Sequence, residues 1–278
     1  MTAPLTVDNL LTLLDQISPF SQAEAWDNVG LMVGDPAREV NGILLALDPT
    51  EELLAECHAH HCNTLITHHP LIFHPLQNIC LNQPQGRLVA RAIELRLNII
   101  ACHTNLDVIP DGVSGILARR LGIAPGSPIQ ATGPEAADTG FGRWGRLPAP
   151  VPGRSFLDQL AKLLRLESLQ VAGPLPETIS TVAVCGGSGS DLVRLAAELG
   201  ADIYISAEIK HAAARWAETR GFCVVDAGHY YSENLVVSQL AATLEQRLAT
   251  LGQKVPLKIS RTQKSPFKAY CYQPSSAE

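Results

Sequence analysis

Short apolar runs and longer amphipathic stretches alternate along the N-terminal part of the chain. The apolar runs are Gly42–Leu47, Thr64–Thr67 and Asn98–Cys102, and helical patterns over 50–61 and 86–97 separate them. Apolar runs of this kind, alternating with helices of about ten residues, are typical of βα units with parallel strands. We therefore predict an α/β fold for this part of the chain.

The same alternation returns in the C-terminal part. Here the apolar runs are Thr181–Cys185, Asp202–Ser206 and Phe222–Asp226, separated by helical patterns over 191–199 and 210–220. A repeated triplet of strands indicates two α/β halves of related topology, with mostly parallel or mixed sheets.

The stretch between the two triplets, 124–152, is rich in Gly, Pro and Ala. That composition is poor in helix and is typical of a boundary with short extended segments. We predict a first half over 1–126, a second half over 127–258 and a polar tail over 259–278. Whether the helix before the tail packs on the first half stays open at this stage.

Composition narrows the class of protein. The 278 residues are 46% hydrophobic, which is enough for a real core, and only 17% charged, which hints at surface covered by other subunits. The net charge of −6 disfavours general binding to nucleic acid or to an anionic membrane surface. No apolar stretch is long enough for a membrane span.

Cysteine usage and the N-terminus indicate a reduced compartment. The seven cysteines include no CxxC pair, and the amphipathic start of the chain has neither a basic region nor an apolar core of a signal peptide. We expect a cytoplasmic protein.

Three predicted strands end in histidine and carboxylate residues. These ends are Thr67–Pro70 with its two histidines, His103–Asp107, and Asp226–Asn234. The carboxyl ends of parallel strands meet at one edge of a sheet, where α/β proteins place their chemistry. Imidazole and carboxylate together suit divalent ions such as zinc, manganese or iron.

The spacings favour two ions over one. His229 and Glu233 are four residues apart and share a face if the chain becomes helical after Gly228. The adjacent His68 and His69 diverge from an extended backbone, so two neighbouring ions would take one each. A carboxylate that bridges them would complete a dinuclear centre.

Two other polar clusters allow more than one interpretation. The segment Cys57–Cys62 is rich in potential ligands but falls at the end of a predicted helix, so a solvated helix end competes with adventitious zinc binding. Glu208 and His211 follow a strand at the metal-bearing edge. A role beside the metal or in substrate binding is as open for them as a structural one.

Two glycine-containing segments complete the candidates. Gly186–Ser190 joins a strand to a helix and could receive an anion, but it lacks a nucleotide-loop signature, so we favour tight packing. The segment Trp26–Gly30 is interpreted as a turn with a buried aromatic side chain.

These motifs together resemble the Nif-three-like family, whose members are often called GTP cyclohydrolase 1 type 2 homologues. The resemblance runs from about Val7 to Leu251. It rests on five stretches in order: Ala25–Leu31, Thr67–Phe73, His103–Asp107, Val184–Gly189 and Asp226–Glu233.

The resemblance implies two divalent ions in a cleft between the halves, and subunits assembled as a toroidal homohexamer. It places His103 beside the centre. Ala207 stands where many relatives have Gly before the acidic residue, which weakens the transfer of a role to Glu208. The implied metal ligands are His68, His69, Asp107, His229 and Glu233, with Glu233 bridging.

The resemblance and the ligands lead to one leading hypothesis and one rival. The leading hypothesis is a metal-dependent hydrolase that acts through a metal-bridging hydroxide on a small molecule, with a nucleotide such as GTP as the candidate substrate. In it His103 shuttles a proton, and Glu208 or His211 orients the substrate. The rival is a non-catalytic metal-binding scaffold, or a regulatory or metal-handling hexamer.

Overall fold

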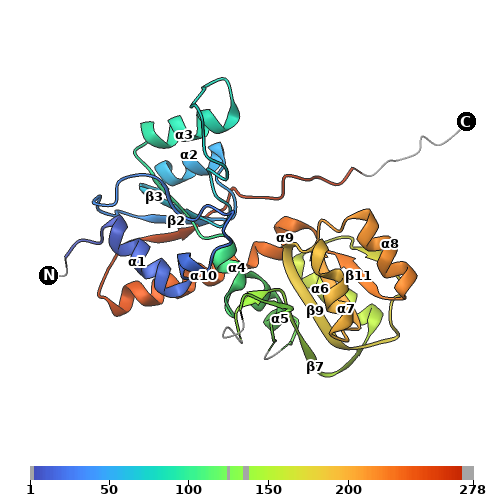
Figure 1. The fold of residues 1–278 in the computed structure, drawn as a ribbon. Helices are drawn as coiled ribbons and strands as arrows, with labels where there is room; N and C mark the ends of the chain where they lie inside the picture. The colour runs from blue at the N-terminus through green and yellow to red at the C-terminus, as the bar shows by residue number, and fades with distance from the viewer. Residues whose placement is uncertain (1–2, 124–125, 134–137, 271–278) are drawn as a thin grey trace, which may run out of the picture.

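The computed structural model describes residues 3–123, 126–133 and 138–270. It contains two five-stranded sheets and a small two-stranded sheet (Figure 1). The apolar runs predicted as strands fall in these two sheets, which confirms the predicted α/β class with mixed sheets. The predicted tail beyond residue 270 lies outside the described residues.

The first sheet has the strand order β1-β4-β3-β2-β12. Strands β4, β3, β2 and β12 are parallel, and β1 pairs antiparallel with β4 at the edge. The strands are β1 (Gly30–Val33), β2 (Ile43–Ala46), β3 (Thr64–Thr67), β4 (Asn98–Ala101) and β12 (Leu257–Ile259). The helices of this half are α1 (Val7–Ile17), α2 (Glu51–Ala59), α3 (Pro84–Glu94) and α10 (Leu235–Thr250).

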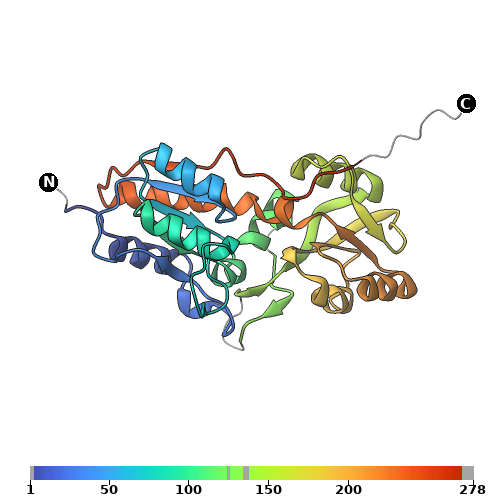
Figure 2. The same cartoon turned by 90° about the horizontal axis from the view of Figure 1, so that it is seen from above.

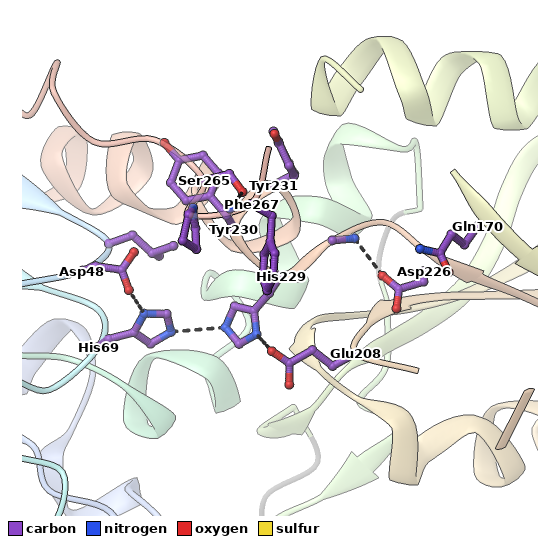
Figure 3. Close-up of a pocket in the computed structure, with 13 residues that line it drawn as sticks. Asp48, His69, Gln170, Glu208, Asp226, His229, Tyr230, Tyr231, Ser265 and Phe267 are labelled. Carbon is purple, nitrogen blue, oxygen red and sulfur yellow. Dashed lines mark hydrogen bonds and ion pairs between the residues drawn. The ribbon is translucent and has the colours of Figure 1, made fainter. Parts of the chain in front are cut away.

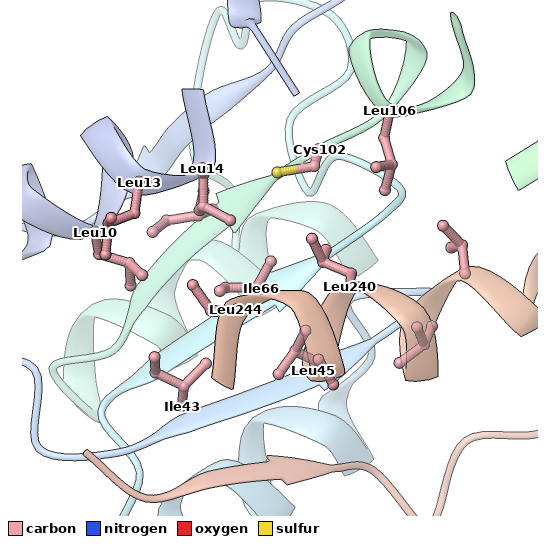
Figure 4. Close-up of a cluster of buried hydrophobic side chains, with 14 of the residues drawn as sticks. Leu10, Leu13, Leu14, Ile43, Leu45, Ile66, Cys102, Leu106, Leu240 and Leu244 are labelled. Carbon is pink, nitrogen blue, oxygen red and sulfur yellow. The ribbon is translucent and has the colours of Figure 1, made fainter. Parts of the chain in front are cut away.

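Both faces of the first sheet are covered by helices. Ile43 and Leu45 of β2 face α1 and α10, where Leu10 and Leu244 complete one buried cluster (Figure 4). Leu44, between them in sequence, points to the opposite cluster, formed with α2 and α3. Because successive strand side chains alternate between faces, an unbroken apolar run is what a sheet covered on both sides requires.

The second sheet has the order β7-β9-β10-β11-β8, with β9, β10 and β11 parallel and the two edge strands antiparallel. Helix α6 covers one face, and α7 and α8 cover the other. The strands are β7 (Arg143–Pro152), β8 (Gln170–Ala172), β9 (Thr178–Ser188), β10 (Ile203–Ala207) and β11 (Cys223–Asp226). The helices are α6 (Gly153–Leu164), α7 (Val193–Glu198) and α8 (His211–Arg220).

Short elements connect the two halves. Helix α5 packs against β9 of the second sheet and against α10, and α9 leads directly into α10 (Figures 1 and 2). The remaining elements are α4 (Thr104–Val108), α5 (Val113–Arg120), α9 (His229–Glu233) and the β5–β6 pair (Gln130–Ala131 and Gly140–Phe141), with 3-10 turns at Phe20–Gln22 and Ser190–Leu192.

The chain returns to the first half after α9. Helix α10 buries Val236, Leu240 and Leu244 against α1, and β12 then pairs with β2. The predicted boundary at residue 258 therefore does not separate the two sheets. The physical reason is the apolar face of α10, which together with α1 covers the face of the first sheet that carries Ile43 and Leu45. Within the described part of the chain, no helix is long and apolar enough to cross a membrane.

Candidate metal centre

The candidate ligands lie where the parallel strands of both sheets end. His68 and His69 follow β3, His103 precedes α4 after β4, and Asp107 lies on α4. In the second half, α9 begins at His229 and ends at Glu233, so the predicted helical spacing of these two residues is present. The seam between the halves thus receives side chains from both sheets.

His69, His229 and Glu233 form one cluster. The Glu233 Oε2 atom lies 2.9 Å from Nε2 of His229 and 3.1 Å from Nε2 of His69. The two imidazole nitrogens are 3.3 Å apart and face each other (Figure 3). Ligand atoms on one tetrahedral ion about 2.1 Å away lie roughly 3.4 Å from each other. The three atoms therefore have the separation that a shared divalent ion requires.

His68 and its neighbours form a second group beside the first. His68, His69 and His103 each offer a nitrogen within 4.8 Å of the others. The Nε2 atom of His68 lies 3.6 Å from Oδ1 of Asp107 and 3.8 Å from Oε1 of Glu233. The carboxylate of Glu233 thus faces His68 with one oxygen and the first cluster with the other.

All four imidazoles have Nδ1 bound to an oxygen. The acceptors lie 2.7–2.8 Å away, and three of them are carboxylates. Such partners fix the ring orientation and leave Nε2 toward the centre, as in carboxylate–histidine–metal arrangements. The pairs are His68 with the Cys102 carbonyl, His69 with Asp48, His103 with Asp27, and His229 with Glu208.

Two buried atoms of the centre have no hydrogen-bond partner among the described residues. They are Nε2 of His68 and Oε2 of Glu233, and the latter has only the ion-pair contacts with His229 and His69 described above. Buried polar atoms almost always have partners, because an unsatisfied one costs about 1–3 kcal/mol. A divalent ion would satisfy both atoms, so the donor set and its unpaired atoms fit a bound metal.

The pKa values of His69 and Glu233 also fit a bound metal ion. Burial alone would lower the pKa of His69, but its hydrogen bond to Asp48 and its contact with Glu233 raise that pKa to about 10. Burial would raise the pKa of Glu233, yet His229 and His68 hold it well below its usual range. The buried carboxylate therefore draws positive charge to the site, which a divalent ion supplies while protons are released.

Gly187 makes the position of Glu233 possible. Gly187 has φ +70°, and a Cβ atom built on it would lie 2.0 Å from Oε1 of Glu233. Its backbone N–H donates to the Ser232 hydroxyl oxygen at 3.0 Å, which ties β9 to α9. The glycine-containing segment at the end of β9 thus packs tightly, as predicted, and it packs against a candidate ligand.

Sequence reasoning missed two carboxylates. The Asp27 side chain is fully buried and accepts hydrogen bonds from the backbone N–H and hydroxyl of Thr104 as well as contacting His103. Asp48 follows β2 and contacts His69. The position of Asp48 at a parallel strand end was a usable signal, whereas Asp27 lies in a loop with no periodic pattern.

The aromatic side chain beside Asp27 differs from its prediction. Trp26 is 58% exposed, not buried, and its ring packs at 5.8 Å on Phe73 and at 6.4 Å on His103. The reason is that Asp27, the next residue, turns inward to His103 and leaves Trp26 on the outside.

The two other catalytic candidates have different surroundings. Glu208 adopts φ +53° and brings its carboxylate to 2.8 Å from Nδ1 of His229. His211 is exposed at the start of α8, and no hydrogen bond or ion pair joins it to the other candidates. Of this pair, the structure brings only Glu208 to the cluster.

A pocket of about 650 Å³ opens beside His69 and His229. Asp48, His69, His229 and Glu208 follow one another along one side of it, and Tyr230, Tyr231 and Phe267 lie across from them (Figure 3). The centre is therefore reachable by a small molecule.

Comparisons with known proteins agree with this fold. A protein of Clostridium acetobutylicum named GTP cyclohydrolase 1 type 2 homolog is 30% identical over 264 residues, which cover 95% of this chain and 98% of the relative. The crystal structure of a hypothetical protein from Staphylococcus aureus is 29% identical and superposes with a TM-score of 0.90, covering 96% of this chain and all of that one.

A third similarity concerns the fold alone. The crystal structure of a Bacillus cereus protein related to NIF3 has a TM-score of 0.91 at 21% identity, over 97% of this chain and all of that one. The family model described as Duf34/NIF3 (NGG1p interacting factor 3) matches residues 5–266. With nearly the whole chain matched, and with a relative 30% identical along its length, the chain belongs to the Duf34/NIF3 family.

Proposed function

We propose that this protein binds two divalent metal ions and acts as a metal-dependent hydrolase. The observation that carries the proposal is the buried carboxylate of Glu233. One of its oxygens faces the nitrogens of His69 and His229, and the other faces that of His68. A carboxylate with imidazoles on both sides has the arrangement of a bridging ligand.

The proposed ligands divide between the two oxygens of Glu233. His69 and His229 lie on one side, and His68 and Asp107 lie on the other. Two such ions, when bound, lower the pKa of a water molecule and stabilise negative charge that develops on a substrate oxygen. Mixed imidazole and carboxylate ligation suits zinc, manganese or iron.

His103 is the proposed proton carrier. Its Nδ1 lies 2.8 Å from the buried Asp27 carboxylate, whose pKa is lowered, against the effect of burial, by its contacts with His103 and Thr104. A carboxylate that stays ionised holds the Nδ1 proton, so Nε2 of His103 is left to accept and return a proton. Glu208 holds His229 in place in the same way.

The proposed substrate is a small molecule of nucleotide size. The pocket beside His69 and His229 is about 650 Å³, which is within the range of small-molecule sites. The name of the Clostridium acetobutylicum relative supports a nucleotide as the first candidate. The toroidal homohexamer stays a prediction, supported by the low charged fraction of the chain.

A metal assay followed by a substrate screen tests this proposal. Protein loaded with zinc, manganese or ferrous iron is expected to hold two ions per chain and to hydrolyse one of four probe classes: GTP, other nucleotides, phosphodiesters or cyclic amides. His103→Ala should lower turnover by about 10²–10⁴-fold while leaving the fold and the metal content unchanged. Two ions per chain without turnover of any probe would instead favour the scaffold, and one ion per chain would refute the dinuclear centre.

A further inference from the structure

A second cavity, of about 500 Å³, lies next to the pocket of the metal centre. Both are lined by Tyr230 and Tyr231, so the two tyrosines form a shared wall. Leu45 of the first half and Leu164 of the second half also line the second cavity. It therefore belongs to the same seam between the halves as the candidate ligands.

The two cavities carry opposite charges. The pocket at the metal centre is lined by Asp48, Glu208 and Asp226, with no lysine or arginine among its lining residues. The second cavity is lined by Arg120 and Arg165, with no aspartate or glutamate among its lining residues. In a chain with net charge −6, two arginines without a lining carboxylate mark a locally positive site.

Neither arginine is engaged within the described part of the chain. Arg120 ends α5, and its guanidinium makes no hydrogen bond or ion pair there. Its neighbour Arg119 differs, because its guanidinium pairs with Asp111, a residue that precedes the start of α5. Arg165 caps α6 with φ +56°, a conformation usually given to glycine, and its guanidinium is equally unpaired.

We propose that Arg120 and Arg165 bind an oxyanion group of the substrate, a phosphate or a carboxylate, whose reacting part lies at the metal centre. Guanidinium groups match such oxyanions with paired hydrogen bonds and are always charged. The ligand passes Tyr230 and Tyr231, whose rings lie 5.4 Å apart. This inference rests on the proposed function, because it takes the metal pocket as the place of reaction.

Metal-free protein tests the oxyanion site separately from the metal centre. After metal removal by chelation and dialysis, pyrophosphate and malonate are titrated by calorimetry into the full chain. Arg120→Gln and Arg165→Gln should each weaken pyrophosphate binding about three- to tenfold, and the double variant at least about tenfold, with a smaller dependence on salt. Arg119→Gln is the matched control and should change affinity less than about twofold.

The outcomes distinguish this inference from the proposed function. Pyrophosphate binding without malonate binding assigns the site to phosphate, and binding of both assigns it to oxyanions in general. The oxyanion site would be overturned if wild type and the double variant bound pyrophosphate equally well, or if Arg119→Gln lost as much affinity as the other variants. Neither result would bear on the metal content of the protein. If wild-type protein bound pyrophosphate but took up no divalent metal in the metal assay, the proposed function would be refuted and the oxyanion site would stand.

Discussion

The chain contains two histidine-rich regions that behave differently. The segment Cys57–Cys62 has three histidines and two cysteines within six residues, yet its histidines are exposed at the end of α2. The candidate centre draws its residues from three strand ends of two different sheets, and their donor atoms converge. On a helix, neighbouring side chains point in divergent directions, whereas strand ends meet at an edge.

Orientation and charge separate the two regions further. Every imidazole of the centre has Nδ1 bound to oxygen, whereas Nδ1 of His60 faces the Lys258 ammonium at 3.2 Å. Burial raises the pKa of the Cys57 thiol to about 12, so the thiolate that binds metal is disfavoured. The density of ligand-type residues is therefore a poorer guide to a metal site than convergence and charge compensation.

The largest expected effect on the centre comes from Glu233→Gln. The amide keeps the shape but loses the charge that both groups of imidazoles face, and removal of one member of a buried charge set costs about 3–5 kcal/mol. Metal affinity should fall roughly a thousandfold, measured by elemental analysis and calorimetry. Glu245→Gln, on the exposed face of α10, is the control and should bind metal as wild type does. An unchanged metal-to-chain ratio in Glu233→Gln would exclude it as a ligand.

Gly187→Ala should displace the Glu233 carboxylate, because the added methyl group would occupy its place. The new Cβ would collide with Oε1 of Glu233, so we expect weaker metal binding, by roughly a hundredfold, in addition to a strain of about 1–3 kcal/mol. Gly221→Ala is the matched control, because Gly221 has φ +72° with open space around it. Calorimetry of both variants separates backbone strain from displacement of Glu233. Equal metal affinities would contradict the role of Gly187.

The strand ends and their ligand-type residues could be predicted because they depend on local patterns. The apolar runs ending at Thr67 and Cys102 mark parallel strands, and the i,i+4 spacing of His229 and Glu233 needs only one helical turn. The hydrogen bond that Nδ1 of His103 donates to Asp27 joins residues 76 positions apart, and no periodic pattern in the sequence indicates such a pair.

The return of the chain to the first half is equally non-local. The amphipathic pattern of α10 shows that one face is buried, but not against which sheet. Strand β7 could not be predicted from the sequence for a different reason. It contains Pro148, Pro150 and Pro152, which disfavour a strand unless it lies at an edge, and β7 is the edge strand of its sheet.

Asp48→Asn tests whether orientation matters as the comparison of the two regions implies. The amide oxygen can still accept a hydrogen bond from Nδ1–H of His69, but without its negative charge it no longer raises the basicity of Nε2. Metal affinity should therefore fall about 10–100-fold. Asp191→Asn, an exposed residue paired with Lys210, is the control. Calorimetric titration of zinc measures both. A loss confined to protein stability, without a change in metal affinity, would contradict the role of Asp48.

The smallest effect is expected from the region that looks richest in ligands. The triple variant His58→Ala, His60→Ala, His61→Ala removes three exposed side chains that belong to none of the groups of converging donor atoms in the described residues. Exposed substitutions of this kind typically change stability by less than about 0.5 kcal/mol each, and the metal-to-chain ratio should be that of wild type. If the triple variant lost one ion per chain, the second ion would belong to the end of α2, and the centre at Glu233 would hold only one.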